Sequence, residues 1–328
     1  MDIISFTSPQ FTEFLSLVDD EIRPPGVSTH AWEDFPLILG PGNREMILGI
    51  CEGGRVVAGV GCLVRQFQTS CGPIPVAGVG SVVTRPEFRG RGFSRALQNE
   101  LIHRLGVANV PLAVLWTDRP EIYRGRGFAS AGWEFHVDME PMRVGGAFPE
   151  RFTFRTFGAA DVSTIADLYD RHPFRTLRNP GDAELLYTMP GTRGLVATGE
   201  GGQVVAAVFC GKGADFPDYV VEWSGPLGLV IPLLEEVRHR KWARHLLAPP
   251  GGDRLADQLA RLGATVVARE TGLWKVIQPD GLSRYLQGAG HGASLDSGDP
   301  ASVLGSVGPD GVIIPGVLTV AVWGFDSV

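Results

Sequence analysis

The sequence contains no long hydrophobic run, and this absence limits the classes of protein that it can encode. Among its 328 residues, no stretch approaches the roughly 20 consecutive apolar residues that a membrane-spanning helix needs. The first residues, 1–6, lack the basic start and the apolar core of a secretory signal peptide. The sequence therefore predicts a cytoplasmic protein with no membrane partner.

Cysteine is scarce as well, and its spacing is uninformative. The four cysteines, Cys51, Cys62, Cys71 and Cys210, show no C-x-x-C pair. Zinc sites and redox motifs use such close pairs, and disulfides are rare in proteins that are not exported. We expect free or buried thiols and no metal site.

The chain also lacks an excess of positive charge. It has 29 Lys and Arg against 36 Asp and Glu, a formal net charge of −7. Nucleic-acid binding requires a basic face, so a nucleic acid is not the expected partner. A cationic amine suits the chain better, because an acidic cleft raises the local concentration of such a substrate. Acidic residues gather at 19–21 and 33–34. No G-x-S-x-G motif is present, which argues against an α/β-hydrolase.

The most informative segment, residues 82–97, runs from an apolar strand through a basic, glycine-rich turn into an amphipathic helix. Arg89 and Arg91 supply positive charge, while Gly90 and Gly92 let a ligand approach the backbone closely. The helix that follows directs its free N–H groups toward the turn. The segment therefore predicts a site for a ligand with several phosphate oxygens.

Two common nucleotide motifs do not fit this segment. A G-x-G-x-x-G fingerprint would require a third glycine where Arg95 stands, and no G-x-x-x-x-G-K-[ST] run exists. Arg89-x-x-Gly92-x-Ser94 instead resembles the R/Q-x-x-G-x-G/A motif of the GCN5-related N-acetyltransferases (GNAT), in which this turn holds the pyrophosphate of acetyl-CoA. Ser94 departs from the usual Gly or Ala, but its side chain is small.

A second segment is similar to the same family. Residues 123–128 resemble its Y-x-x-x-G-F pattern, in which the tyrosine reprotonates the departing CoA thiolate. The resemblance implies that Tyr123 is the general acid and that a β-bulge near Val82–Val83 exposes backbone to the donor. It also implies acetyl-CoA contacts at Ser81, Val82 and Val83, at Arg89, Gly90, Arg91, Gly92, Phe93 and Ser94, and at Asp118 and Arg119.

Local periodicity predicts the surrounding elements. A helix is expected over residues 9–22 and another after the turn, with Phe93, Leu97, Leu101 and Leu105 inward and Gln98 outward. Residues 287–300, rich in Gly, Ser and Asp, predict a loop, and residues 317–323 predict a terminal strand.

The second half of the chain repeats the first imperfectly. Residues 52–60, Glu-Gly-Gly-Arg-Val-Val-Ala-Gly-Val, return as Glu-Gly-Gly-Gln-Val-Val-Ala-Ala-Val at 200–208. The strand expected at 218–225 leads into no arginine turn. We therefore predict an α/β (α+β) protein with two tandem GNAT-like domains, each a mixed central sheet flanked by helices. The expected divisions are a catalytic domain at 1–145, a degenerate domain without the pyrophosphate loop at 146–290, and a loop with a terminal strand at 291–328.

This organisation resembles the enhanced-intracellular-survival (Eis) acetyltransferases. Those proteins acetylate amines on aminoglycosides, polyamines or lysines, and they carry a sterol-carrier-like third domain for which the residues after Leu286 are too few. The resemblance implies an acetyl-CoA-dependent N-acetyltransferase acting on a small-molecule or lysine amine, and it is compatible with a homo-oligomer. It also implies that the C-terminal carboxylate of Val328 takes the proton from the amine. The alternative for this residue is that Trp323 and Phe325 only anchor the last strand on the second domain and that water takes the proton. The alternative is a GNAT-fold regulatory protein that binds acyl-CoA without turnover.

Overall fold

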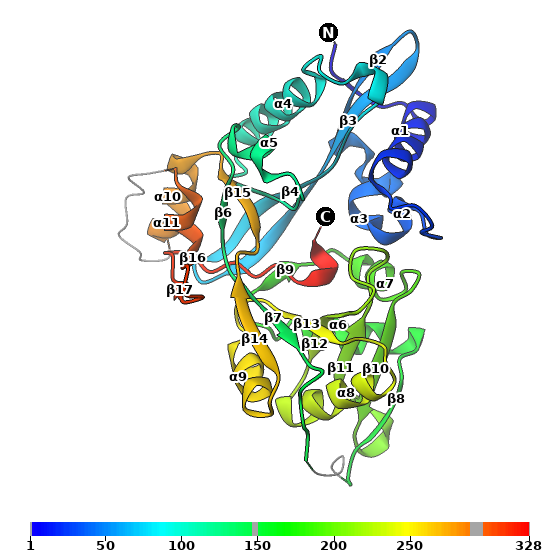
Figure 1. Ribbon diagram of the computed structural model, residues 1–328, viewed down its shortest axis with the longest axis vertical. Helices are drawn as coiled ribbons and strands as arrows, with labels where there is room; N and C mark the ends of the chain where they lie inside the picture. Colours follow the sequence, from blue (N-terminus) through cyan, green and yellow to red (C-terminus); the bar gives the residue numbers. More distant parts are fainter. Residues whose placement is uncertain (1, 146–149, 289–297, 328) are drawn as a thin grey trace.

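The computed structural model describes residues 2–145, 150–288 and 298–327. It contains two large mixed sheets, one above the other in Figure 1, with helices packed against each of them. Within the described ranges the first sheet has eight strands and the second has seven. The predicted fold class, an α/β protein with two helix-flanked mixed sheets, is confirmed.

The first sheet has the strand order β1-β2-β3-β4-β5-β15-β6, and β9 pairs with β3. Its own helices cover both faces: α4 contributes to one core and α1 to the other. The elements of this part of the chain are β1 (Ile4–Ser5), α1 (Ser8–Ile22), α2 (Ala31–Asp34), α3 (Pro36–Leu39), β2 (Ile47–Glu52), β3 (Arg55–Thr69), β4 (Gly72–Thr84), α4 (Phe93–Val107), β5 (Leu112–Leu115), α5 (Pro120–Arg124) and β6 (Ala129–Ala131).

The second sheet has the order β14-β7-β13-β12-β11-β10-β8. Its main core is built from apolar residues of these strands and of α8 and α9. The elements of this part of the chain, of which β9 and β15 belong to the first sheet, are β7 (Glu134–Asp138), β8 (Thr153–Thr156), α6 (Val162–Tyr169), β9 (Arg175–Leu177), α7 (Asp182–Tyr187), β10 (Arg193–Thr198), β11 (Val204–Cys210), β12 (Tyr219–Ser224), α8 (Leu227–His239), β13 (His245–Ala248), α9 (Asp253–Arg261), β14 (Thr265–Arg269) and β15 (Gly272–Val276).

The two sheets exchange strands across the division predicted between residues 145 and 146. β7 precedes that position but lies in the second sheet, between β13 and β14. β15 follows it by more than a hundred residues but lies in the first sheet, between β5 and β6. Each of these two strands therefore lies in the sheet that is built mainly from the other half of the chain. Hydrogen bonding through β15 and β9 ties the first sheet to the second half of the chain.

The end of the chain passes between the two sheets (Figure 1). After α10 (Pro279–Gly288), α11 (Pro300–Leu304) and the short ribbon β16 (Ser306–Val307) with β17 (Ile313–Ile314), Leu318 and residues 320–326 are buried. The strand predicted over 317–323 is wrong: most of this segment is buried but it forms no ladder, and the Thr319 N–H donates to the Ser70 hydroxyl at 3.0 Å. Side-chain burial holds it in place. Most of the predicted loop at 287–300 lies outside the described residues.

Candidate active site

A cleft opens in the first sheet where two parallel strands separate. β4 pairs with β5 from Val76↔Leu112 to Gly78↔Val114, and the pairing ends there although β4 continues to Thr84. Residues 79–84 of β4 line one wall of a cavity of about 580 Å³, and residues 116–119 after β5 line the other. The unpaired edge of β4 thus presents its backbone to the cleft.

A β-bulge distorts β4 along this wall. Its register against β3 shifts between Gly59↔Val83 and Gly61↔Gly80, so two residues of β4 face one of β3. Ser81, at the bulge, has φ of +54°, which is unusual for a residue with a side chain. The predicted bulge near Val82–Val83 is therefore present and begins at Ser81. Val83 is buried in one core, so only its backbone is available to a ligand, whereas Val82 packs partly on the other core and is half-buried.

The glycine-rich turn leads from β4 into α4 as predicted. Gly90 and Gly92 have φ of +76° and +80°, and Gly92 is the N-cap of α4 without a side-chain cap. Arg89 lines the cleft and donates to the Glu21 carboxylate. Arg91 makes two bonds of 2.7 and 2.8 Å to Glu52. Both arginines expected to face phosphate oxygens are thus paired with carboxylates in this structure.

The side chains of Phe93, Ser94 and Gln98 occupy the first two turns of α4. Phe93 is only 4% exposed and packs in the core, so its side chain is not available to a ligand. Ser94 lines the cleft and accepts a hydrogen bond from Gln98 at 3.1 Å and from Arg126 at 3.3 Å. Gln98 was expected to point outward, but it is buried because its amide reaches back one turn to Ser94. Apolar periodicity marks only apolar residues as inward, so it could not predict that a glutamine is buried.

Tyr123 lies on α5 and lines the same cleft. Its ring packs edge-on against Phe128, with centroids 6.2 Å apart, and the Arg126 guanidinium lies 5.8 Å from the ring centroid. Burial raises the pKa of Tyr123 above its ordinary value, and Arg126 opposes the shift. The phenol therefore holds its proton at neutral pH, as a general acid must. Asp118 and Arg119 lie in the same cleft and are exposed.

Asp215, which no sequence pattern marks, reaches this cleft from the second half of the chain. Its loop contacts α2: the Ala214 N–H donates to Asp34 Oδ2 at 3.0 Å. Gly213 has φ of +49°, and a Cβ there would lie 1.7 Å from Asp34. Burial raises the pKa of Asp215, while Lys212 and Arg23 oppose the shift. A loop remote in sequence that contacts the first domain leaves no local pattern by which to find it.

The C-terminal turn, residues 324–326, lies beside this loop. The buried Lys212 ammonium donates to the Gly324 carbonyl at 3.1 Å, to the Ser327 carbonyl and to the Ser327 hydroxyl. Asp326 accepts two bonds of 3.0 and 3.1 Å from Arg178. Lys212 and Arg178, two basic residues of the second half, thus hold the end of the chain. Val328, the predicted base, lies outside the described residues.

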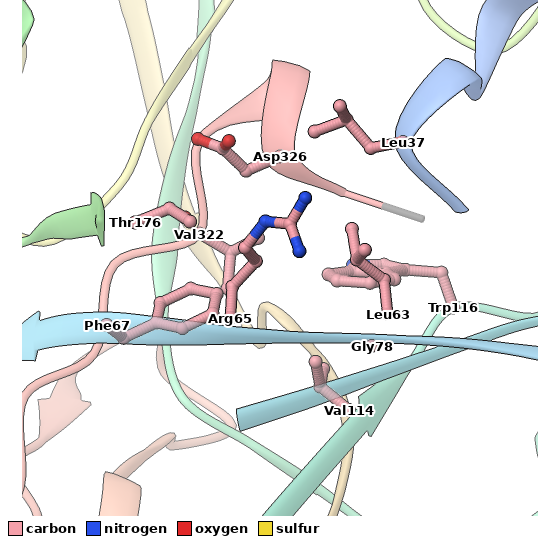
Figure 2. Close-up of a pocket in the computed structure, with 10 residues that line it drawn as sticks. All are labelled: Leu37, Leu63, Arg65, Phe67, Gly78, Val114, Trp116, Thr176, Val322 and Asp326. Carbon is pink, nitrogen blue, oxygen red and sulfur yellow. The ribbon is translucent and has the colours of Figure 1, made fainter. Parts of the chain in front are cut away.

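A small cavity of about 20 Å³ lies behind the point where β4 and β5 separate. Gly78 and Val114, the last paired residues, line it together with Trp116, which also lines the large cleft. Figure 2 shows the Arg65 guanidinium in this cavity, near the turn that carries Asp326. It has room for about one water-sized group. The C-terminal turn therefore covers the sheet behind the cleft.

Comparison with known proteins agrees with this geometry. Residues 3–131 match the family model of the acetyltransferase (GNAT) domain. A probable N-acyltransferase from Enterococcus faecalis is a structural neighbour with a TM-score of 0.64 and 17% identity, covering 84% of this chain and 72% of its own. Eis1 from Mycobacterium abscessus has a TM-score of 0.60 and 15% identity, covering 85% of this chain and 74% of its own. The sequence has no match among curated proteins.

At these identities the structural neighbours establish a shared fold. The family match places a domain of the GNAT superfamily at residues 3–131, and the fold shared with these neighbours covers 84–85% of the chain. This superfamily contains N-acyltransferases that use acyl-CoA. Over the parts of the chain that the structure describes, no helix is long and apolar enough to cross a membrane. No group of three or more His, Cys, Asp or Glu side chains suited to a metal ion occurs there either.

Proposed function

We propose that this protein is an acetyl-CoA-dependent N-acetyltransferase that acts on a primary amine. The observation that carries the proposal is the convergence of three features on one cleft: the bulged edge of β4, the Arg89 turn at the start of α4, and Tyr123. In this proposal residues 1–145 carry the catalytic site, residues 146–290 form the degenerate copy and residues 291–328 the terminal segment.

The residues that we propose to bind the acetyl-CoA donor line the walls of the cleft. Arg89, the N–H groups after Gly92 and the small Ser94 suit the pyrophosphate, because a helix N-terminus and a guanidinium both favour anions. The Arg89–Glu21 pair is exposed at the arginine, and such pairs contribute about 0–1 kcal/mol, so phosphate can replace the carboxylate. The backbone of Ser81–Val83 suits the pantetheine, and Asp118 and Arg119 lie at the opposite wall.

The chemistry requires a proton to leave the amine, in this proposal for the C-terminal carboxylate of Val328, and another to reach the thiolate. The donor supplies the acetyl group as a thioester, and the backbone of the bulged strand faces the cleft where negative charge develops. Tyr123 holds a proton that it can give to the thiolate. On the donor side, the backbone of the bulged strand would thus stabilise the negative charge and Tyr123 would protonate the thiolate.

Acidic side chains from both halves of the chain reach the cleft. Glu21 and Asp215 line the cleft, one from each half of the chain, and a cationic amine is attracted to such a pair. The proposed acceptors are therefore amines of the aminoglycoside, polyamine or lysine type.

A thiol-release assay tests the proposal. Acetyl-CoA is incubated with an aminoglycoside, a polyamine and a lysine peptide in turn, and acetyl-CoA binding is measured separately by calorimetry. We expect amine-dependent release of CoA thiol. The alternative, a regulatory protein that binds acyl-CoA without turnover, predicts binding with no release for any amine.

A further inference from the structure

The second domain contains a cleft at the position that corresponds to the acyl-donor cleft of the first. β12 runs parallel to β13, and α8 follows β12, as β4 runs parallel to β5 and is followed by α4. The pairing of β12 with β13 covers only Tyr219↔His245 and Val220↔Leu246. Beyond these residues the strands separate, and a cavity of about 350 Å³ opens past their carboxyl ends.

The start of α8 presents free backbone donors to this cavity. Pro226 is the N-cap and Leu227 the first helical residue, and both line the cavity. The N–H groups of Leu229 and Val230 donate to the Pro226 carbonyl at 2.9 and 3.0 Å. The N–H groups of Leu227 and Gly228 have no acceptor in the described ranges. A 13-residue helix with an uncapped start favours an anion at that end.

Two arginines add full positive charge to the same cavity. Arg171 follows α6, and Arg254 lies in the first turn of α9. Neither side chain has a hydrogen bond or an ion pair within the described part of the chain. The neighbouring acid, Asp253, is not among the lining residues, and its carboxylate accepts the Gly251 N–H at 3.1 Å. The charge that faces the cavity is therefore positive.

A buried donor without a partner lies in the same wall. Trp223 lines the cavity and is 5% exposed, and its indole N–H has no acceptor in the residues that the structure describes. His172 lies within 2.9 Å of the Trp223 carbonyl, and burial lowers the pKa of His172 to about 4, so the ring is neutral. The remaining walls are apolar, from Leu168, Leu227 and Leu255.

We propose that this cleft binds a small organic anion, with a phosphate or carboxylate head between Arg171, Arg254 and the start of α8 and an apolar body against the leucines. A second acyl-CoA fits less well, because the arginine-glycine turn is missing and Pro226 has no N–H to offer. The cavity is also smaller than the donor cleft, about 350 Å³ against about 580 Å³. The degenerate domain thus lost the donor site and kept an anion site of a different composition.

Calorimetry on the full chain tests this site with two probes, phenyl phosphate and 3-phenylpropionate, which carry the two head groups on one apolar body. We expect saturable binding of at least one probe, weakened about tenfold or more by Arg171→Gln with Arg254→Gln. Arg261→Gln removes one arginine charge from the far end of α9, outside the lining of the cavity, and should leave binding unchanged. Arg89→Ala, in the first cleft, should also leave it unchanged. Absence of saturable binding by both probes overturns the proposal, and so does loss through Arg89→Ala with retention in the double variant.

Gly228→Glu supplies a second test that does not depend on the arginines. A Cβ at Gly228 meets no atom within 4 Å, and an acidic residue in the first turn stabilises a helix, so the fold is retained. The new carboxylate competes with the anion at the start of α8. We expect probe binding to fall about tenfold or more with an unchanged melting temperature. Unchanged binding would contradict the proposed position of the head group.

Discussion

The guanidinium of Arg89 donates to the carboxylate of Glu21 at the edge of the cleft that both residues line. The two residues come from different elements, Glu21 from the end of α1 and Arg89 from the turn before α4. Because the proposed pyrophosphate needs the same guanidinium, Glu21 competes with the donor for Arg89.

This competition predicts opposite effects for two substitutions. Arg89→Ala should weaken acetyl-CoA binding by about tenfold or more, since a charge-assisted bond contributes about 1.5–3 kcal/mol. Glu21→Gln should strengthen binding by about two- to fivefold, because it removes a weak competing pair. Calorimetry at low ionic strength measures both. Arg104→Ala, which removes an arginine paired with Glu100 on α4 instead, is the control and should change little. Unchanged affinity for acetyl-CoA in Arg89→Ala would contradict the proposal that Arg89 binds the pyrophosphate.

Tyr123 should affect turnover and leave donor binding intact. Tyr123→Phe keeps the ring against Phe128 but removes the proton, so kcat should fall by about 100-fold with little change in acetyl-CoA affinity. Since burial raises the pKa of Tyr123, the wild-type phenol should remain a donor through pH 9. Steady-state kinetics and calorimetry separate the two effects. Equal turnover in the variant would mean that water or another group supplies the proton.

Asp215 should affect the KM for the amine acceptor and not the KM for acetyl-CoA. Asp215→Asn keeps the shape of the side chain and removes its charge, so KM for a polyamine should rise by about fivefold or more while KM for acetyl-CoA stays constant. Asp218→Asn removes an equal charge from the same connection outside the lining of the cleft, and is the matched control. A parallel rise in both KM values would indicate a disturbed loop instead of a lost acceptor contact.

Lys212 should make stability depend on pH. Burial lowers the pKa of Lys212 to about 7, below its ordinary value of 10.5. Between these values the unfolded chain binds the proton and the folded chain does not, so this group makes the free energy of unfolding rise as pH increases from 7 to 10. Urea denaturation measures the free energy of unfolding of wild type and of Lys212→Met. The difference between the two should shift in favour of wild type as pH rises from 7 to 10. A difference independent of pH would mean that Lys212 stays charged when folded.

The sequence alone determined the local features of the candidate site. The spacing of Arg89, Gly92 and Ser94 marks a turn into a helix, and the two glycines do adopt the positive φ that such a turn uses. Tyr123 was found in a similar way, since the Y-x-x-x-G-F pattern that residues 123–128 resemble is also a short run of consecutive residues. The apolar period of α4 likewise fixed which leucines face the core, although it could not show that Gln98 is buried by its bond to Ser94.

Only the tertiary structure decided which distant segments meet. β7 and β15 exchange sheets, Asp215 enters the cleft of the first domain, and Arg171 and Arg254 converge on a second cleft. Each of these relationships depends on hydrogen bonds and packing between segments far apart in the chain, and such contacts impose no periodicity on either segment. The predicted strand at 317–323 illustrates the same limit. Apolar residues there report burial, and burial between two sheets does not require a strand.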